Sequence, residues 1–188
     1  MTDIMLWRRL DLPGHEIGRL ERRGQGWQLS GTALVCYERR PCKLDYLVIC
    51  DSGWQTESAR IAGTIGARDI DLRVTVDPER RCYLDGAECP AVAGCIDIDL
   101  GFSPATNLLP IRRLSLRPGE YAEVRAAWLP FPSLVFELLP QVYRREGEHT
   151  YRYESAGGAF VRLLEVSAVG FVRSYPGLWE EECRDERV

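Results

Sequence analysis

Residues 69–76 read DIDLRVTV, an unbroken alternation of polar and apolar side chains. Apolar residues at every second position place one face of a strand on a core and the other face in solvent. The same period recurs at 96–100 and at 122–126. Because one-sided strands of this kind are typical of antiparallel sheets, the alternation predicts an all-β, antiparallel protein.

Short strand-like segments continue in both directions from this stretch. Turn signals such as Asp77-Pro78, Asp85-Gly86 and Pro118-Gly119 separate them at short spacing. Many short strands with regular turns predict a barrel, a roll or a sandwich. Helix is expected only as a single turn at 104–108, with Ser103 as its N-cap. The further strands are predicted at 4–10, 15–21, 27–37, 44–51, 54–62, 80–84, 110–117, 133–143, 149–155, 159–166 and 169–175.

The length of the chain suits one domain, 1–188. Residues 72–86 and 161–177 share the order strand, turn, strand, glycine turn, which indicates two duplicated halves at about 1–92 and 93–179. Residues 180–188 are polar and are expected to form a C-terminal tail.

The composition excludes several classes of protein. A formal net charge of −4, from 24 basic and 28 acidic residues in a mixed order, argues against a nucleic-acid partner. No apolar run reaches transmembrane length and no secretory leader pattern is present, so a cytoplasmic location is expected. With two histidines and seven cysteines that never form C-x-x-C, neither a metal nor a cofactor is expected.

Residues 94–114, GCIDIDLGFSPATNLLPIRRL, carry an unusual density of polar side chains. Asp97 and Asp99 share one strand face, and Arg112 and Arg113 follow on the next predicted strand. An Arg–Asp ion-pair network is the favoured interpretation, and acid–base catalysis by the aspartates is the alternative. Residues 103–107 are read as a capped turn, or alternatively as a loop that presents Asn107 to a ligand.

The aromatic residues are numerous, with five Trp and eight Tyr. Core packing explains most of them, but large aromatic side chains also line apolar ligand sites. The segment 128–143, WLPFPSLVFELLPQVY, is the most apolar of the chain and contains three prolines. Because proline cannot donate to a central ladder, this segment is expected to form the rim of a cavity or a homodimer contact.

Several sequence blocks together resemble a known bacterial family, which is described as "putative glycolipid-binding". The blocks are Trp7-Arg8-Arg9-Leu10, Gly14-x-Glu16, Cys50-Asp51-x-x-Trp54, Gly94–Leu100, Ser103–Asn107, Leu109–Leu114, Ala127-Trp128, Phe131-Pro132, Gln141-x-Tyr143 and Tyr175–Leu178. The resemblance spans nearly the whole chain and implies a spiral β-roll, a long meander curled around an interior.

The resulting hypothesis is non-catalytic binding of a lipid or glycolipid in an apolar cavity. Arg112 and Arg113 are expected to hold an anionic head group, since guanidinium suits bidentate contact with phosphate or carboxylate. Asn107 is the other polar ligand contact. The cavity and its rim are assigned to Trp54, Trp128, Gln141, Tyr143 and Tyr153. An enzyme that uses Asp97 and Asp99 with the arginines, and a dimerisation module that uses 128–143, remain the alternatives.

Overall fold

A computed structural model describes residues 2–186 as a single 15-stranded sheet with one short α-helix. The all-β meander predicted from the alternation is confirmed, and 69–76 lies within β6. The strands are β1 Thr2–Arg9, β2 Gly14–Arg23, β3 Gly26–Tyr37, β4 Arg40–Cys50, β5 Thr56–Ile65, β6 Arg68–Val76, β7 Cys82–Leu84, β8 Ala87–Glu88, β9 Asp97–Leu100, β10 Tyr121–Leu129, β11 Glu137–Arg145, β12 Thr150–Ser155, β13 Phe160–Val166, β14 Val172–Tyr175 and β15 Trp179–Glu186.

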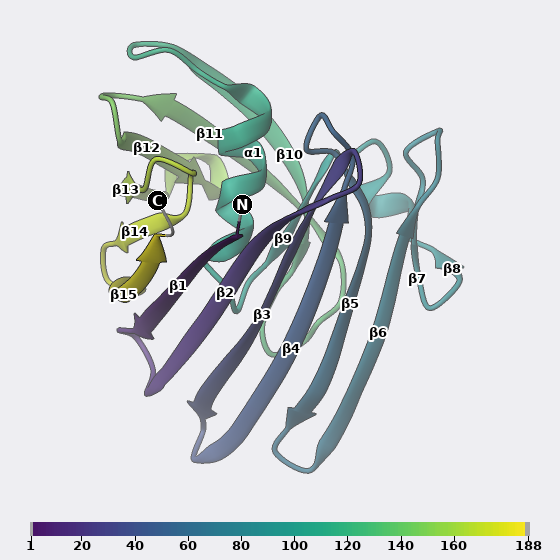
Figure 1. Ribbon diagram of the computed structural model, residues 1–188. Coiled ribbons are helices and arrows are strands. Elements are labelled where there is room, and N and C mark those ends of the chain that lie inside the picture. Colours follow the sequence, from purple (N-terminus) through teal and green to yellow (C-terminus); the bar gives the residue numbers. More distant parts are fainter. Residues whose placement is uncertain (1, 187–188) are drawn as a thin grey trace.

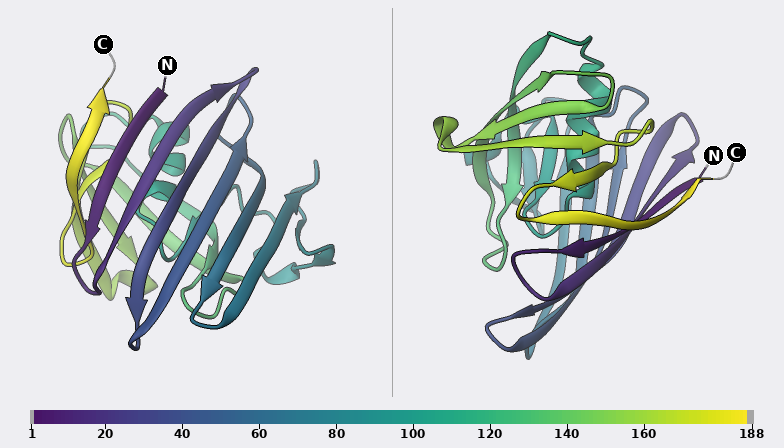
Figure 2. Two further views of the ribbon diagram at one scale, coloured as in Figure 1. Left: turned by 60° about the horizontal axis from the view of Figure 1, so that its bottom comes forward. Right: turned by 90° about the vertical axis from the view of Figure 1, so that its left-hand side faces the viewer.

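The order of strands in the sheet places the two ends of the chain at its centre. Strands β8 to β1 run in reverse sequence order and are followed by β15 to β9. Strand β1 pairs with both β2 and β15, so the two series form one surface. The sheet is not closed by a ladder but curls, and its two parts enclose α1 (Leu108–Leu114) (Figures 1 and 2). We call β1–β8 the first half and β9–β15 the second half.

The C-terminal segment differs from the expected tail. Residues up to Glu186 form β15, which pairs with β14 and β1, whereas 187–188 lie outside the described residues. Cross-strand ion pairs hold this polar strand: Glu180 contacts Arg8 at 2.9 Å and Glu181 contacts Arg173 at 2.6 Å. Opposite charges on neighbouring strands support pairing, and this compensates for the poor apolar content.

One part of the second half departs from the antiparallel meander. Strands β9 and β10 are parallel, and a parallel pair needs a crossover connection. Residues 101–120 supply it through a 3₁₀ turn, η2 (Ala105–Asn107), and α1. The strand predicted at 110–117 is therefore wrong. Residues 102–111 are buried without a break, so this crossover fills the interior of the curl.

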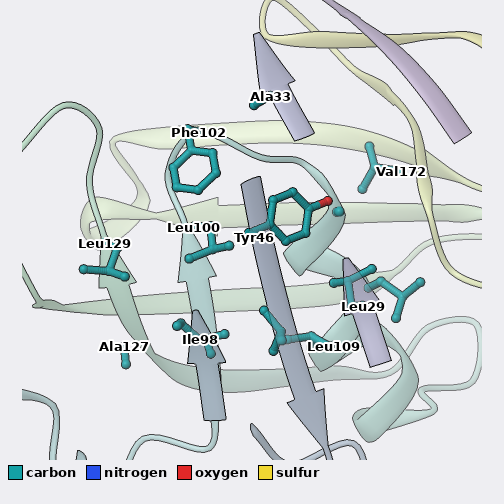
Figure 3. Close-up of a cluster of buried hydrophobic side chains, with 14 of the residues drawn as sticks. Leu29, Ala33, Tyr46, Ile98, Leu100, Phe102, Leu109, Ala127, Leu129 and Val172 are labelled. Carbon is teal, nitrogen blue, oxygen red and sulfur yellow. The ribbon is translucent and has the colours of Figure 1, made fainter. Parts of the chain in front are cut away.

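The core lies between the two halves and the crossover. Leu29, Ala33 and Tyr46 from the first half meet Leu100 and Phe102 from the second (Figure 3). The Tyr46 and Phe102 rings pack edge to face at 6.1 Å. Such burial contributes about 1.5–3 kcal/mol for each large apolar side chain and fixes the two halves against each other.

Arg80, which follows β6 in the first half, connects the start of β9 to the first half. Strand β9 is the edge strand of the second half. Arg80 donates to the carbonyl oxygens of Thr56, Cys95 and Ile96, each at 2.9 Å. The Thr56 amide also donates to Ile96 O at 3.1 Å. These bonds satisfy backbone groups at the entrance to β9, where the ladder itself does not continue. They hold β9 in a fixed position, and β9 carries Asp97 and Asp99.

Smaller elements complete the described part of the chain. The remaining 3₁₀ turns are η1 Pro90–Val92 and η3 Ala156–Gly158. Within residues 2–186, no helix is long and apolar enough to span a bilayer.

A candidate ligand pocket in the second half

The second half contains a largely apolar pocket of about 350 Å³. Pockets that bind small molecules commonly measure about 300–1,000 Å³ and combine apolar walls with a few polar groups. Every lining residue comes from the second half, but from seven separate segments of it. They are Asp99, Leu100, Gly101, Ser103, Asn107, Trp128, Leu139, Tyr153, Ser155, Ala156, Phe160, Tyr175, Leu178 and Trp179.

One polar wall of the pocket is built by Asp99, Gln141 and Tyr153. The Gln141 Nε2 group donates to Asp99 Oδ2 at 2.6 Å and to the Tyr153 hydroxyl oxygen at 3.1 Å. Gln141 is buried, so its amide is committed to these two partners. Burial raises the pKa of Asp99 to about 6, although the hydrogen bond from Gln141 opposes the shift. The wall therefore offers a carboxyl group that titrates near neutral pH.

A second polar contact lies beside η2. The Tyr143 hydroxyl donates to Asn107 Oδ1 at 2.8 Å, and Asn107 Nδ2 donates to Pro104 O at 3.3 Å. Tyr143 is 1% exposed and does not line the pocket, whereas Asn107 does. Tyr143 therefore orients Asn107, and of the two residues only Asn107 faces the pocket.

Behind the pocket wall lies a buried carboxyl group. Glu16 on β2 is 1% exposed, and its Oε1 accepts from Ser103 Oγ at 2.5 Å and from the Tyr46 hydroxyl at 2.7 Å. Its Oε2 has no partner among the described residues. Burial raises the pKa of Glu16 to about 8 against the opposing hydrogen bonds. Ser103 thus connects the pocket to a carboxyl group in the first half that is protonated at neutral pH.

Aromatic rings form the apolar walls. Phe160 lies 6.1 Å from Tyr153 and 6.2 Å from Tyr175, between ring centroids. Trp128 approaches the backbone at Gly101, where a Cβ atom would lie 2.9 Å from its Nε1. The missing side chain at Gly101 therefore allows Trp128 to line the pocket.

The structure brings together five of the eight sequence-predicted site residues. Asn107, Trp128 and Tyr153 line the pocket, and Gln141 and Tyr143 support it from behind. Asp99, which the sequence places in an ion-pair network or, alternatively, in catalysis, also lines the pocket. Pro140 pairs with Arg125 of β10 but stands just before the β11–β12 ladder, which starts at Gln141. Its missing N–H group therefore interrupts no hydrogen bond to β12.

The other three predicted residues lie elsewhere. Arg113 forms a bidentate ion pair with Asp97, with distances of 2.5 and 3.1 Å, which confirms the expected Arg–Asp pairing. Trp54 stacks on Trp27 at 4.3 Å, and Arg112 lies over the Trp54 ring at 5.1 Å. None of the three lines this pocket, and the contact of Arg112 and Arg113 with an anionic head group stays a prediction.

The sequence analysis does not assign Glu16, Phe160, Tyr175 or Trp179 to the site, although Glu16 and Tyr175 stand in the blocks that carry the family resemblance. A usable signal existed for Glu16, because it occupies an inward position of β2 together with Gly18 and Leu20. A carboxylate on a buried face normally marks a specific polar contact. The pocket offers no comparable signal, since its residues are distant in sequence. Among the described residues, no cluster of His, Cys, Asp or Glu is suited to a metal ion.

The fold and the pocket together define a curled all-β protein with an apolar cavity in one half. The chain belongs to the family described as "Putative glycolipid-binding", which matches residues 4–181. It is similar to the crystal structure of a DUF1089 family protein from Pseudomonas aeruginosa, with 32% identity and a TM-score of 0.78 over 88% of this chain and 91% of the other.

A more distant likeness concerns the fold alone. A β-barrel-like protein of the DUF1849 domain from Brucella abortus is 6% identical, with a TM-score of 0.55 over 98% of this chain and 97% of the other. No curated protein matches the sequence at a significant level.

Proposed function

We propose that the chain binds a lipid or glycolipid non-covalently in the second-half pocket. The observation that carries this proposal is the combination of apolar walls with one hydrogen-bonding wall at Asp99, Asn107 and Tyr153. Burial of an apolar chain contributes about 0.8 kcal/mol for each CH₂ group. The family description supports the same class of ligand.

The polar wall favours a hydroxylated head group over an anionic one. Asp99 accepts hydrogen bonds when ionised and would repel a phosphate or carboxylate. A sugar hydroxyl can donate to Asp99 or to Asn107 Oδ1 and can accept from Tyr153. The Trp128 and Phe160 rings offer apolar faces beside these groups. This part of the proposal replaces the role expected for Arg112 and Arg113.

Native mass spectrometry of the protein incubated with a bacterial lipid extract tests the proposal. The wild type should retain an amphiphile, and Leu139→Arg, which places a cation in the pocket wall, should not. Leu163→Arg is the matched control, because Leu163 is 52% exposed on β13. Equal retention by Leu139→Arg and wild type, or no retained lipid in any sample, would contradict binding in this pocket.

One observation favours an enzyme as the second candidate. Asp99 faces the pocket with its pKa raised to about 6 by burial, and a carboxyl group that titrates near the working pH suits general acid–base catalysis. Asp97 is committed to Arg113 and takes no part. In the same mass spectra, conversion of the added lipid to a smaller product would support catalysis, whereas recovery of unchanged lipid supports binding. A homodimer through 128–143 stays a prediction.

A further inference from the structure

A second pocket, separate from the one described above, lies at the C-terminal end of α1. Its volume is about 240 Å³, and its lining is mostly polar. Its lining includes the guanidinium groups of Arg112 and Arg145 and the hydroxyl-bearing side chains of Ser115, Tyr151 and Ser167. Arg112 comes from the crossover helix, and Arg145 from the end of β11. The two pockets share no lining residue.

Arg112 is held in place, but the described part of the chain offers its guanidinium no polar partner. Within residues 2–186, its guanidinium forms neither an ion pair nor a hydrogen bond, and it lies over the Trp54 ring. A Cβ atom at Gly170 would lie 3.3 Å from Arg112 Cδ, so this loop packs directly against the arginine stem. The ring and the loop hold the side chain, while the edges of the guanidinium keep their five N–H donors available.

Arg145 is held still more firmly and also lacks a carboxylate partner in the described part of the chain. It donates to the carbonyl oxygens of Leu116 at 2.7 Å, Gly147 at 3.1 Å and Glu148 at 2.5 Å. Its guanidinium lies 5.7 Å from the centre of the Tyr151 ring. Carbonyl oxygens fix the orientation of the group but do not neutralise its charge. Three of its five donors are used in this way, and two remain.

The surroundings add hydroxyl donors and little opposing charge. Ser115 and Ser167 line the pocket, and the positive charges of Arg112 and Arg145 both act on the Tyr151 hydroxyl. Glu148 is the carboxylate in the lining, but its side chain is 85% exposed and lies 3.8 Å from His149 Nε2. The site therefore concentrates two unneutralised cations in a protein whose net charge is −4.

We propose that this pocket binds the phosphate group of a phosphomonoester. Two guanidinium groups match the charge of a phosphate dianion, and each can make paired hydrogen bonds to its oxygens. The volume exceeds the need of one phosphate, so the pocket has room for part of the group that carries it. The phosphate could belong to a free small molecule or to a phospholipid head group such as phosphatidic acid.

Isothermal titration calorimetry at low ionic strength tests the site with inorganic phosphate and glycerol phosphate. The wild type should bind glycerol phosphate, and its affinity should fall as NaCl is added. Arg112→Gln should weaken binding at least tenfold. Arg60→Gln is the matched control, because Arg60 is an exposed first-half residue that pairs with Asp71 at the surface. Equal weakening by both variants would show a general charge effect and overturn the site.

A second pair of variants guards against loss of folding in Arg112→Gln. Ala168→Glu adds a carboxylate to the exposed lining of the pocket and should abolish phosphate binding at an unchanged melting temperature. Ala91→Glu adds the same charge at an exposed position in η1 and should not change binding. Retained phosphate binding by Ala168→Glu would contradict the proposal.

Vesicle co-sedimentation distinguishes the two sources of phosphate. Binding to phosphatidylcholine vesicles that contain phosphatidic acid, lost in Ala168→Glu, supports a lipid head group. Binding of glycerol phosphate without vesicle binding supports a free phosphomonoester. If the wild type binds neither, the site is wrong. Leu139→Arg should bind phosphate as the wild type does, because Leu139 lines the lipid pocket and not this one. A failure of the phosphate experiments would therefore leave the lipid-binding proposal standing.

Discussion

Strands β3–β5 in the first half and β11–β12 in the second enclose α1 from opposite sides (Figures 1 and 2). The side chains on their inner faces differ. Strand β4 turns Leu44, Tyr46 and Val48 inward, and all three are at most 3% exposed. Strands β11 and β12 turn Gln141 and Tyr153 inward, with their polar atoms hydrogen-bonded to each other. The long strands of the first half, with apolar inner faces, suit a supporting wall. The buried polar groups of the second half would cost stability if they were not hydrogen-bonded to each other.

This difference indicates a division of roles between the halves. The first half supplies a large apolar surface that holds the fold, and the second half uses part of its interior for a polar-walled pocket. Substitutions in the first half should therefore change stability more than binding, and those in the pocket should do the reverse. Glu16 is the exception that connects the two, since it contacts Ser103 of the second half.

The largest effect is expected for Trp7→Ala. Trp7 is fully buried, its Nε1–H donates to Val172 O at 2.5 Å, and its ring meets Phe171 edge to face at 5.3 Å. It therefore joins β1 to the second half. Removal of a buried indole leaves a cavity and an unsatisfied carbonyl, so the free energy of unfolding should fall by about 3–5 kcal/mol. Urea denaturation followed by circular dichroism measures this.

Trp128→Ala is the matched test in the second half. Trp128 is only half-buried and lines the pocket, so its removal should cost clearly less stability and should abolish lipid retention. If the two variants lose equal stability, or if Trp7→Ala alone loses lipid at a temperature where it is folded, the division between the halves is wrong.

The same division explains how much of the fold could be predicted. Strict alternation identified β6, β9 and β10, because a one-sided strand needs it. The helix at 108–114 was read as a strand, since LLPIRRL is too short for its period to be recognised and carries Pro110, which the first turn of a helix tolerates. This error placed Arg112 and Arg113 on a strand, whereas the helix directs one to Trp54 and the other to Asp97.

The pocket could be predicted only in part. Trp128 and Tyr153 were found as members of an aromatic excess, and Gln141 through the family resemblance. Phe160 and Tyr175 approach Tyr153 only because β12, β13 and β14 are consecutive neighbours in the curled sheet. Such contacts depend on long-range pairing, and residue spacing in the sequence does not encode them.

Glu16→Gln should produce an intermediate effect that depends on pH. The pKa of Glu16 is about 8 in the folded protein, against an ordinary 4.5. Below pH 4.5 the Glu16 carboxyl group is neutral in both the folded and the unfolded protein, so its ionisation does not change the free energy of unfolding. Between pH 4.5 and 8 the unfolded chain ionises first, so the free energy of unfolding of the wild type falls by up to about 1.4 kcal/mol per pH unit. Above pH 8 both states are ionised, and the loss stays constant.

Glutamine keeps the acceptor for Ser103 and Tyr46 but cannot ionise. Relative to wild type, Glu16→Gln should therefore gain about 3–4 kcal/mol on going from pH 5 to pH 8 in urea denaturation. Asp99, whose pKa is also raised, contributes equally to both proteins and cancels in the difference. Glu57→Gln, at an exposed position on β5, is the control. The same stability difference at both pH values would rule out a buried, protonated Glu16.

The smallest effect is expected from the removal of one hydroxyl group in each half. The Tyr46 hydroxyl donates to Glu16, and the Tyr153 hydroxyl accepts from Gln141 at the pocket wall. Both side chains are at most 3% exposed, and both lose only an oxygen on substitution by phenylalanine. Each change should lower the free energy of unfolding by about 1 kcal/mol, the usual net value of one hydrogen bond.

Binding separates these two variants where stability does not. Tyr153→Phe removes a hydrogen-bonding group from the pocket and should weaken glycolipid retention in native mass spectrometry, whereas Tyr46→Phe should retain the ligand as the wild type does. Since the two proteins would be almost equally stable, a difference in retention reports on the pocket and not on folding. Equal loss of ligand in both variants would mean that the first half also shapes the binding site, through the contact of Glu16 with Ser103.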